Sequence, residues 1–168
     1  KKAVAILDVA PLGPDYLPAH GHADTLSFEM SVLGERVVVN GGTSGYENNN
    51  IRLKERQTSS HSTVEVNNKD SSEVWGSFRV ANRAYPKNLS IKELDNQINI
   101  SCSHTGYAKQ GKGIWHIRNW LMKDNEIEVI DQIKGEYNTA TSRVIFHPNV
   151  SITKKHNSIF DIHLLSGK

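Results

Sequence analysis

The chain has 168 residues, which suits one domain with a single hydrophobic core. Its 20 lysine and arginine residues nearly balance 18 aspartate and glutamate residues, so the charge gives no reason to expect a nucleic-acid partner. One cysteine, Cys102, excludes an internal disulfide, and no apolar run approaches the roughly 18 residues of a membrane helix. We expect residues 1–168 to form one domain. Because the sequence starts without Met and without a signal-peptide pattern, we expect it to be a piece of a longer chain.

Strand-like segments recur along the chain, whereas helical periodicity is scarce. We predict strands over residues 2–9, 18–32, 36–39, 61–66, 78–85, 97–104, 114–122, 126–133, 143–147 and 159–165. Residues 40–50 and 106–113 are predicted loops, and residues 51–60 hold at most one short helical turn. About ten short strands predict an all-β fold, an antiparallel two-sheet β-sandwich.

The segment 18–32 alternates between two kinds of side chain. On a strand, side chains two residues apart share a face. One face would then carry His20, His22, Asp24, Leu26, Phe28, Met30 and Val32. The apolar half of that face is expected to be core, which places two imidazoles and a carboxylate at its end. Burying such groups without partners is costly, so we expect them to be hydrogen-bonded, to bind a metal or to line a cleft.

Two polar residues from other segments are expected to join this group. His61 begins a predicted strand and Asn40 follows another, and strand ends and loops gather at the rims of sandwiches, where binding sites are commonly built. Histidines with an oxygen donor suit zinc. By spacing alone the pattern is weak, because His-x-His also occurs by chance and a lone buried histidine is more often a hydrogen-bonded core residue.

Several motifs in order resemble the C-terminal β domain of the heparinase II/III-like family. They are PAHGHADTLSF at 18–28, RQTSSHSTV at 56–64 and SEVWGSFR at 72–79, followed by shorter matches at 104–107, 116–118, 131–135 and 146–148. Each motif is modest alone, but their correct order makes the resemblance specific. It covers roughly residues 9–150.

The resemblance implies both an architecture and a site. Family members place an α/α-toroid domain before the β-sandwich, with the substrate in the groove between them, and that toroid domain is absent from the 168 residues. A metal, commonly zinc, is held on the β domain, at positions that match His22, Asn40 and His61. His20 matches a position that faces the substrate. Members often belong to bacterial polysaccharide loci, which implies a periplasmic or secreted location.

Two positions depart from the family pattern. Asn40 stands where the family usually has Asp, which removes a charged ligand, although an amide oxygen still coordinates more weakly. Ser62 replaces the usual Asn after the third histidine. Asp24 either restores a carboxylate to the metal or hydrogen-bonds an imidazole from outside the coordination shell.

The resemblance therefore predicts the C-terminal domain of a polysaccharide lyase that cleaves an acidic, uronic-acid-containing polysaccharide by β-elimination. Such an enzyme must neutralise a carboxylate, remove the neighbouring proton and protonate the leaving oxygen. We assign His20 to proton transfer or carboxylate contact, and Tyr46, Arg56 and Arg79 to substrate contact. A solvated turn and ordinary surface charges are the alternatives for the last three residues. Because the family's catalytic Tyr lies in the toroid domain, the isolated domain is expected to be inactive or nearly so.

Two other functions fit the same residues. One is a non-catalytic carbohydrate-binding or scaffold domain in bacterial polysaccharide metabolism, which Asn40 and the missing toroid domain favour. The other is a stand-alone metal-dependent hydrolase. It is disfavoured because no carboxylate pair at glycosidase spacing is evident in the sequence.

Overall fold

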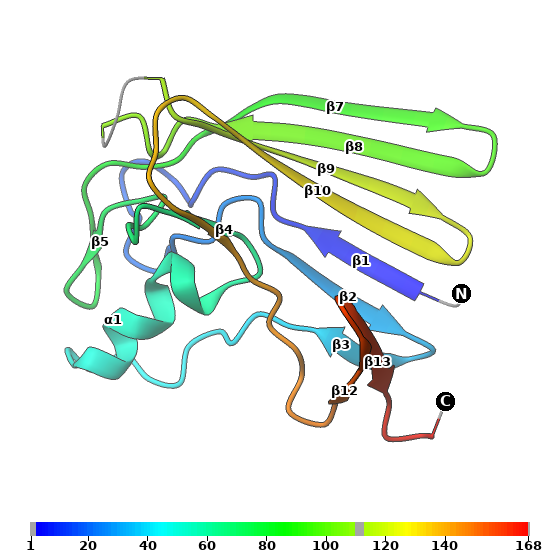
Figure 1. Cartoon of the computed structure of the whole chain (residues 1–168). Helices are drawn as coiled ribbons and strands as arrows, with labels where there is room; N and C mark the ends of the chain where they lie inside the picture. Colours follow the sequence, from blue (N-terminus) through cyan, green and yellow to red (C-terminus); the bar gives the residue numbers. More distant parts are fainter. Residues whose placement is uncertain (1–2, 110–112, 168) are drawn as a thin grey trace.

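Two antiparallel sheets carry the longer strands of the computed structural model, which describes residues 3–109 and 113–167. One sheet has the order β1-β2-β3 and contains β1 (Ala3–Leu7), β2 (Phe28–Val32) and β3 (Glu35–Val38). The other has the order β10-β9-β8-β7 and contains β7 (Pro86–Leu94), β8 (Gln97–His104), β9 (Trp115–Lys123) and β10 (Glu126–Lys134). The four-stranded sheet packs over the three-stranded one (Figure 1). The predicted all-β, antiparallel sandwich is confirmed.

Short elements surround these two sheets. Three two-stranded ladders pair β4 (Val64–Val66) with β11 (Ala140–Ser142), β5 (Val74–Trp75) with β6 (Arg79–Val80), and β12 (Ser151–His156) with β13 (Ile159–His163). One helix, α1 (Asn50–Arg56), leads into the 3₁₀ turn Thr58–Ser60. Within the described ranges, none of the helical segments has the length and apolar character to cross a membrane.

The core between the sheets explains why the strands pair as they do. Leu26, Cys102 and Trp120 form one buried cluster, and Leu7 packs against it. Leu7 also packs against the neighbouring cluster around Phe28, so that β1 contributes to both. Burial of these side chains supplies the apolar area that holds two half-solvated sheets together.

The prediction of one strand over residues 18–32 is wrong for its first half. Residues 8–27 form a loop of turns, and β2 begins only at Phe28. Leu26 has a φ of 65°, far from the extended conformation of a regular strand, and Thr25, which alternation places on the face opposite the expected core, is buried. Hydrogen bonds override the alternation: the Leu26 N–H donates to the Asp8 carbonyl (3.0 Å), and the Thr63 hydroxyl donates to the Thr25 carbonyl (3.0 Å).

Other errors concern exposed edges. The nine-residue strand β7 was not predicted, because it is an edge strand whose side chains are mostly polar or exposed, and β12 was missed for the same reason. The strand predicted over 78–85 contains only β6, and the one predicted over 143–147 is a single bridge between Val38 and Phe146. Parts of the predicted strand 2–9 and of the predicted loop 106–113 lie outside the described residues.

A buried hydrogen-bond chain crosses β8, β9 and β10. His104 Nδ1 accepts a hydrogen bond from the Gly106 N–H (3.1 Å), so its proton lies on Nε2 and points at His116 Nδ1 (3.2 Å). His116 Nε2 then donates to Asp131 Oδ1 (2.8 Å). Burial lowers the pKa of both histidines, and the pKa of His104 falls well below its ordinary value. Both rings are therefore neutral at neutral pH.

We predict that His104 makes the stability of the domain sensitive to acid. The unfolded chain protonates this histidine near pH 6.5, whereas the folded chain does not, so its contribution is complete above about pH 6.5 and is lost as the pH falls below that value. His104→Gln should cost roughly 1–3 kcal/mol at neutral pH. Urea unfolding measures the free energy of unfolding between about pH 7.5 and about pH 5. This free energy should fall less steeply with decreasing pH in the variant than in the wild type. Equal slopes would contradict this assignment.

Candidate functional site

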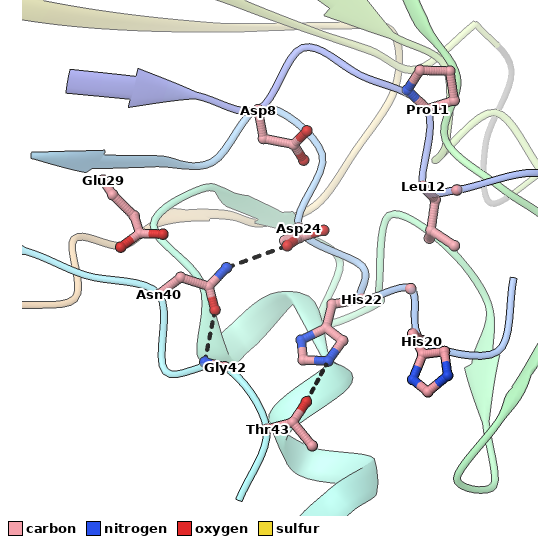
Figure 2. Close-up of a pocket in the computed structure, with 12 residues that line it drawn as sticks. Asp8, Pro11, Leu12, His20, His22, Asp24, Glu29, Asn40, Gly42 and Thr43 are labelled. Carbon is pink, nitrogen blue, oxygen red and sulfur yellow. Dashed lines mark hydrogen bonds between the residues drawn. The ribbon is translucent and has the colours of Figure 1, made fainter.

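Three separate segments meet at one end of the three-stranded sheet. They are the loop 8–27, the residues just after β3, and the stretch from α1 to residue 63. The loop and the residues after β3 border an open pocket of about 520 Å³, shown in Figure 2. His22, Asp24 and His61 each offer a ligand atom, and these atoms lie within 4.8 Å of one another. The structure thus brings these three residues together, as the sequence predicts. Turns of the loop 8–27, rather than the alternation of a strand, place His22 and Asp24 there.

The loop that carries His22 is held by close backbone packing. A Cβ atom on Gly21 would lie 1.9 Å from Leu12 Cδ2 and 2.7 Å from the Leu12 carbonyl oxygen, so only glycine fits between the two histidines of the His-x-His motif. The Ala23 N–H donates to the carbonyl of Arg56 at the end of α1 (2.8 Å). The loop is therefore fixed to the helix directly beside His22.

Two threonines fix Asp24 relative to His61. Thr58 Oγ1 donates to the Ala23 carbonyl (2.7 Å), and Thr63 Oγ1 donates to the Thr25 carbonyl (3.0 Å). These carbonyls flank Asp24 in the chain, and the two threonines lie on either side of His61. All four bonded groups are buried, so each bond is protected from competition by water.

The electrostatics favour neutral imidazoles. Burial lowers the pKa of His61 to about 4, and burial together with the nearby His61 and Arg52 lowers the pKa of His22 to about 4. Neither buried nitrogen of His61 makes a hydrogen bond of good geometry, although a backbone interaction with Glu55 partly opposes the fall in its pKa. Unsatisfied buried nitrogens are costly, and a metal ion is one group that would satisfy them.

Each of the two histidines has a nitrogen available to a metal. His22 Nε2 contacts Arg52 Nη1 (3.0 Å) and Thr43 Oγ1 (3.3 Å), as Figure 2 shows for the threonine. Nδ1 is the His22 nitrogen without such a contact. A metal bound there would require the ring proton on Nε2, which would then donate to Thr43 Oγ1 and lose the hydrogen bond from Arg52 Nη1, while neither nitrogen of His61 makes a hydrogen bond of good geometry. With the Asp24 carboxylate, these form a two-nitrogen, one-oxygen donor set, which fits zinc.

Asn40 lies beside this group in a supporting position. Its Nδ2 donates to Asp24 Oδ2 (3.3 Å), and its Oδ1 accepts a hydrogen bond from the Gly42 N–H (2.9 Å), so the amide oxygen already has a donor (Figure 2). Burial raises the pKa of Asp24 to about 6. Burial and the charge of Asp24 raise the pKa of Asp8, on the same pocket wall, to about 7. Of the two options left open for Asp24, the geometry favours the one that restores a carboxylate ligand.

His20 belongs to an exposed aromatic cluster next to the metal-ligand group. Its ring meets Tyr46 edge-on (centroids 5.4 Å apart) and lies 6.4 Å from Phe78. Tyr46 and Phe78 are stacked, and more than half of Tyr46 is exposed to solvent. We call His20, Tyr46 and Phe78 the aromatic platform. Aromatic faces beside a polar pocket suit the apolar faces of sugar rings.

The two arginines predicted to contact substrate occupy very different places. Arg56 is fully buried; its Nε donates to the Gly21 carbonyl and its Nη1 to the Gly76 carbonyl, both at 3.0 Å. Arg79 is exposed and lies over the ring of Trp75, 4.7 Å from its centroid. Arg56 therefore lies beneath the pocket, where it joins the His20–His22 loop to the β5–β6 hairpin.

Sequence reasoning did not single out Asp8 or the two threonines, and it gave Arg52 only a candidate contact with anionic sugars. Asp8 follows an apolar strand directly, and an aspartate at a strand end is a signal that was available. The contact of Arg52 with His22 could not be predicted, because it spans thirty residues and depends on where α1 packs. The threonines lie inside the motif at 56–64, and their roles become visible only when the partner carbonyls are known.

Comparisons with known proteins agree with this architecture. Residues 1–167 match the family model described as heparinase II/III-like, C-terminal. The fold is similar to that of a heparan sulfate lyase HepC mutant from Pedobacter heparinus (TM-score 0.70, 19% identity, 90% of this chain and 22% of that one). It is also similar to a heparinase III (TM-score 0.63, 20% identity, 81% of this chain and 20% of that one). No curated protein sequence matches the chain.

The chain therefore belongs to the heparinase II/III-like family and corresponds to its C-terminal region. It spans about a fifth of the length of the solved structures that it resembles. The resemblance expected from the sequence motifs is confirmed. At these identities the structural likeness shows a shared fold.

We predict that Arg56 and Arg79 differ sharply in their effect on folding. Arg56→Ala leaves two backbone carbonyls without a donor and opens a cavity, so it should lower the free energy of unfolding by roughly 2–4 kcal/mol. Arg79→Ala should change it by about 0.5 kcal/mol or less, since this side chain is exposed. Urea unfolding measures both values. Similar values for the two variants would show that the Arg56 contacts contribute little.

Proposed function

We propose that this chain is the C-terminal β domain of a polysaccharide lyase that cleaves an acidic, uronic-acid-containing polysaccharide by β-elimination. Family membership supports the reaction class, and the solved relatives are named as heparan sulfate lyases and a heparinase III. The observation that carries the proposal for this domain is the meeting of His22, Asp24 and His61 beside an open pocket. The proposal includes an upstream α/α-toroid domain, because the chain spans only about a fifth of those relatives.

Within this proposal, His22, Asp24 and His61 hold a zinc ion with a structural role. When bound, the ion would supply a fixed positive charge that joins the loop 8–27 to the segment after α1. The chain's own residues prepare this site: burial keeps both imidazoles neutral, and Asn40 orients the carboxylate of Asp24. Such supporting hydrogen bonds are a general feature of protein metal sites.

The aromatic platform is the proposed substrate surface. Tyr46 and Phe78 present ring faces to a sugar, while His20 lies at the edge of the pocket with a titratable ring exposed to solvent. His20 would transfer a proton or contact the uronate carboxylate. Arg79, exposed on the β5–β6 hairpin, would contact an anionic group of the polymer. An acidic polysaccharide is the substrate that this surface and the family suggest, and the family resemblance alone suggests a periplasmic or secreted location.

A non-catalytic carbohydrate-binding domain is the alternative function. The replacement of the family's usual Asp by Asn40 favours it, because that change removes one charged group from the site. Asp24 argues against it, since its carboxylate lies within reach of both imidazoles.

We predict that the domain binds zinc and that Asp24 contributes more than Asn40. Zinc affinity is measured at neutral pH by competition with a chromogenic chelator. Asn40→Ala removes a supporting hydrogen bond and should weaken binding by about 10- to 100-fold, whereas Asp24→Asn and His61→Ala remove a ligand and should weaken it further. An Asn40→Ala variant that binds as weakly as His61→Ala would instead make Asn40 the ligand. Absence of zinc binding by the wild type would remove the metal from the proposal.

We predict that His20→Ala slows β-elimination by the full-length protein. Loss of a proton-transfer group typically costs about 10²- to 10⁴-fold in rate. Absorbance of the unsaturated uronate product, followed over a panel of acidic polysaccharides, measures the rate. His156→Ala, which removes an exposed histidine on β12, is the matched control and should leave the rate unchanged. A wild-type protein without activity on the whole panel, but with affinity for one of its members, would favour the binding domain.

A further inference from the structure

We propose that Arg118, on β9 of the four-stranded sheet, is a positioning residue for the metal site. The inference rests on the proposed metal-binding role of His22, Asp24 and His61, and it adds a residue that contacts none of them. Arg118 is 1% exposed, and its guanidinium reaches out of the sheet towards the loops that form the site. We call this guanidinium and its hydrogen-bond partners the Arg118 clamp; the partners are Asp131 and the carbonyls of Leu26 and Ser62.

The same Arg118 nitrogen joins both segments of the site. Nη1 donates to the Leu26 carbonyl (2.7 Å) and to the Ser62 carbonyl (2.6 Å). Leu26 follows Asp24 by two residues, and Ser62 follows His61 directly. A single planar group thus fixes the separation of the two chain segments that carry a carboxylate and an imidazole of the site.

The backbone of Leu26 explains why such a clamp is required. Leu26 adopts a φ of 65°, a left-handed conformation that is unfavourable for leucine, although its side chain is fully buried. The loop turns at this point, because the Ser27 N–H donates to the Asp24 carbonyl (2.8 Å). The hydrogen bond from Arg118 to the Leu26 carbonyl holds the strained residue in place, and with it the turn that presents Asp24.

The other end of the guanidinium is anchored in the sheet. Arg118 Nε donates to Asp131 Oδ1 (2.6 Å) and Nη2 donates to Asp131 Oδ2 (2.8 Å), a two-point contact between neighbouring strands β9 and β10. Asp131 also accepts hydrogen bonds from His116 Nε2 (2.8 Å) and Ser142 Oγ (2.9 Å). Four hydrogen bonds thus hold the carboxylate, and its two bonds with Arg118 fix the plane of the guanidinium.

Arg118→Lys tests the clamp while it keeps the positive charge. One ammonium group cannot make the two-point contact with Asp131 and also span both carbonyls. The control is Ile114→Val, which shortens a buried core side chain in a cluster that does not contain Leu26. Both variants are compared with the wild-type domain. Zinc affinity is measured by chelator competition. Amide exchange of Leu26, Ser27 and Thr63, all hydrogen-bonded within the two segments, is measured by NMR without metal.

We expect Arg118→Lys to weaken zinc binding by about tenfold or more and to speed exchange of those three amides together, while Ile114→Val changes neither by more than about twofold. Asp131→Asn should act in the same direction, and it replaces Arg118→Lys if that variant does not fold. Unchanged exchange at the three amides, or wild-type zinc affinity in Arg118→Lys, would overturn the positioning role. If the wild type binds no zinc, the proposed metal site fails, and the exchange comparison alone supports or overturns the clamp.

Discussion

The Arg118 guanidinium bonds Asp131 at two points within the four-stranded sheet and bonds the carbonyls of Leu26 and Ser62 outside it. The sheets are held together by apolar packing around Leu7 and Trp120, which has no directional preference. Hydrogen bonds from a planar, buried group do have direction, and they place the irregular loop 8–27 in a single arrangement. A buried ion pair of this kind adds little to the free energy of unfolding, because burying the two charges is costly. We infer that its main role is to select one arrangement of the loop.

The site follows from this constraint together with burial. Low solvent access keeps His22 and His61 neutral and raises the pKa of Asp24, and the proposed cation would offset the cost of burying all three groups. The same loop presents His20 on its other side, beside Tyr46 and Phe78. One irregular segment thus carries two of the three proposed metal ligands and the histidine of the aromatic platform, with Gly21 between His20 and His22.

Much of the architecture was predictable from the sequence, and the errors have a common cause. Alternation identified the all-β sandwich and the hairpin of β9 and β10, since long half-buried strands carry a strong period of two. It failed over residues 18–27, where hydrogen bonds from distant residues, such as that from Thr63 to the Thr25 carbonyl, bury polar side chains in a loop. The motifs identified His22 and His61, but the role of Asn40 depends on contacts with Asp24 and Gly42 that no spacing reveals. Arg118 lies in the short match at 116–118, but its role could not be predicted, because its carbonyl partners lie 92 and 56 residues away.

The central claim is that His22, Asp24 and His61 bind one metal ion, with His22 coordinating through Nδ1. Anomalous diffraction at the zinc edge, from crystals of the domain grown with zinc, tests it most directly. The account predicts one strong peak at about 2.0–2.2 Å from His22 Nδ1, a His61 nitrogen and an Asp24 oxygen. Zinc bound elsewhere, or a peak that leaves His61 without a ligand bond, would contradict it.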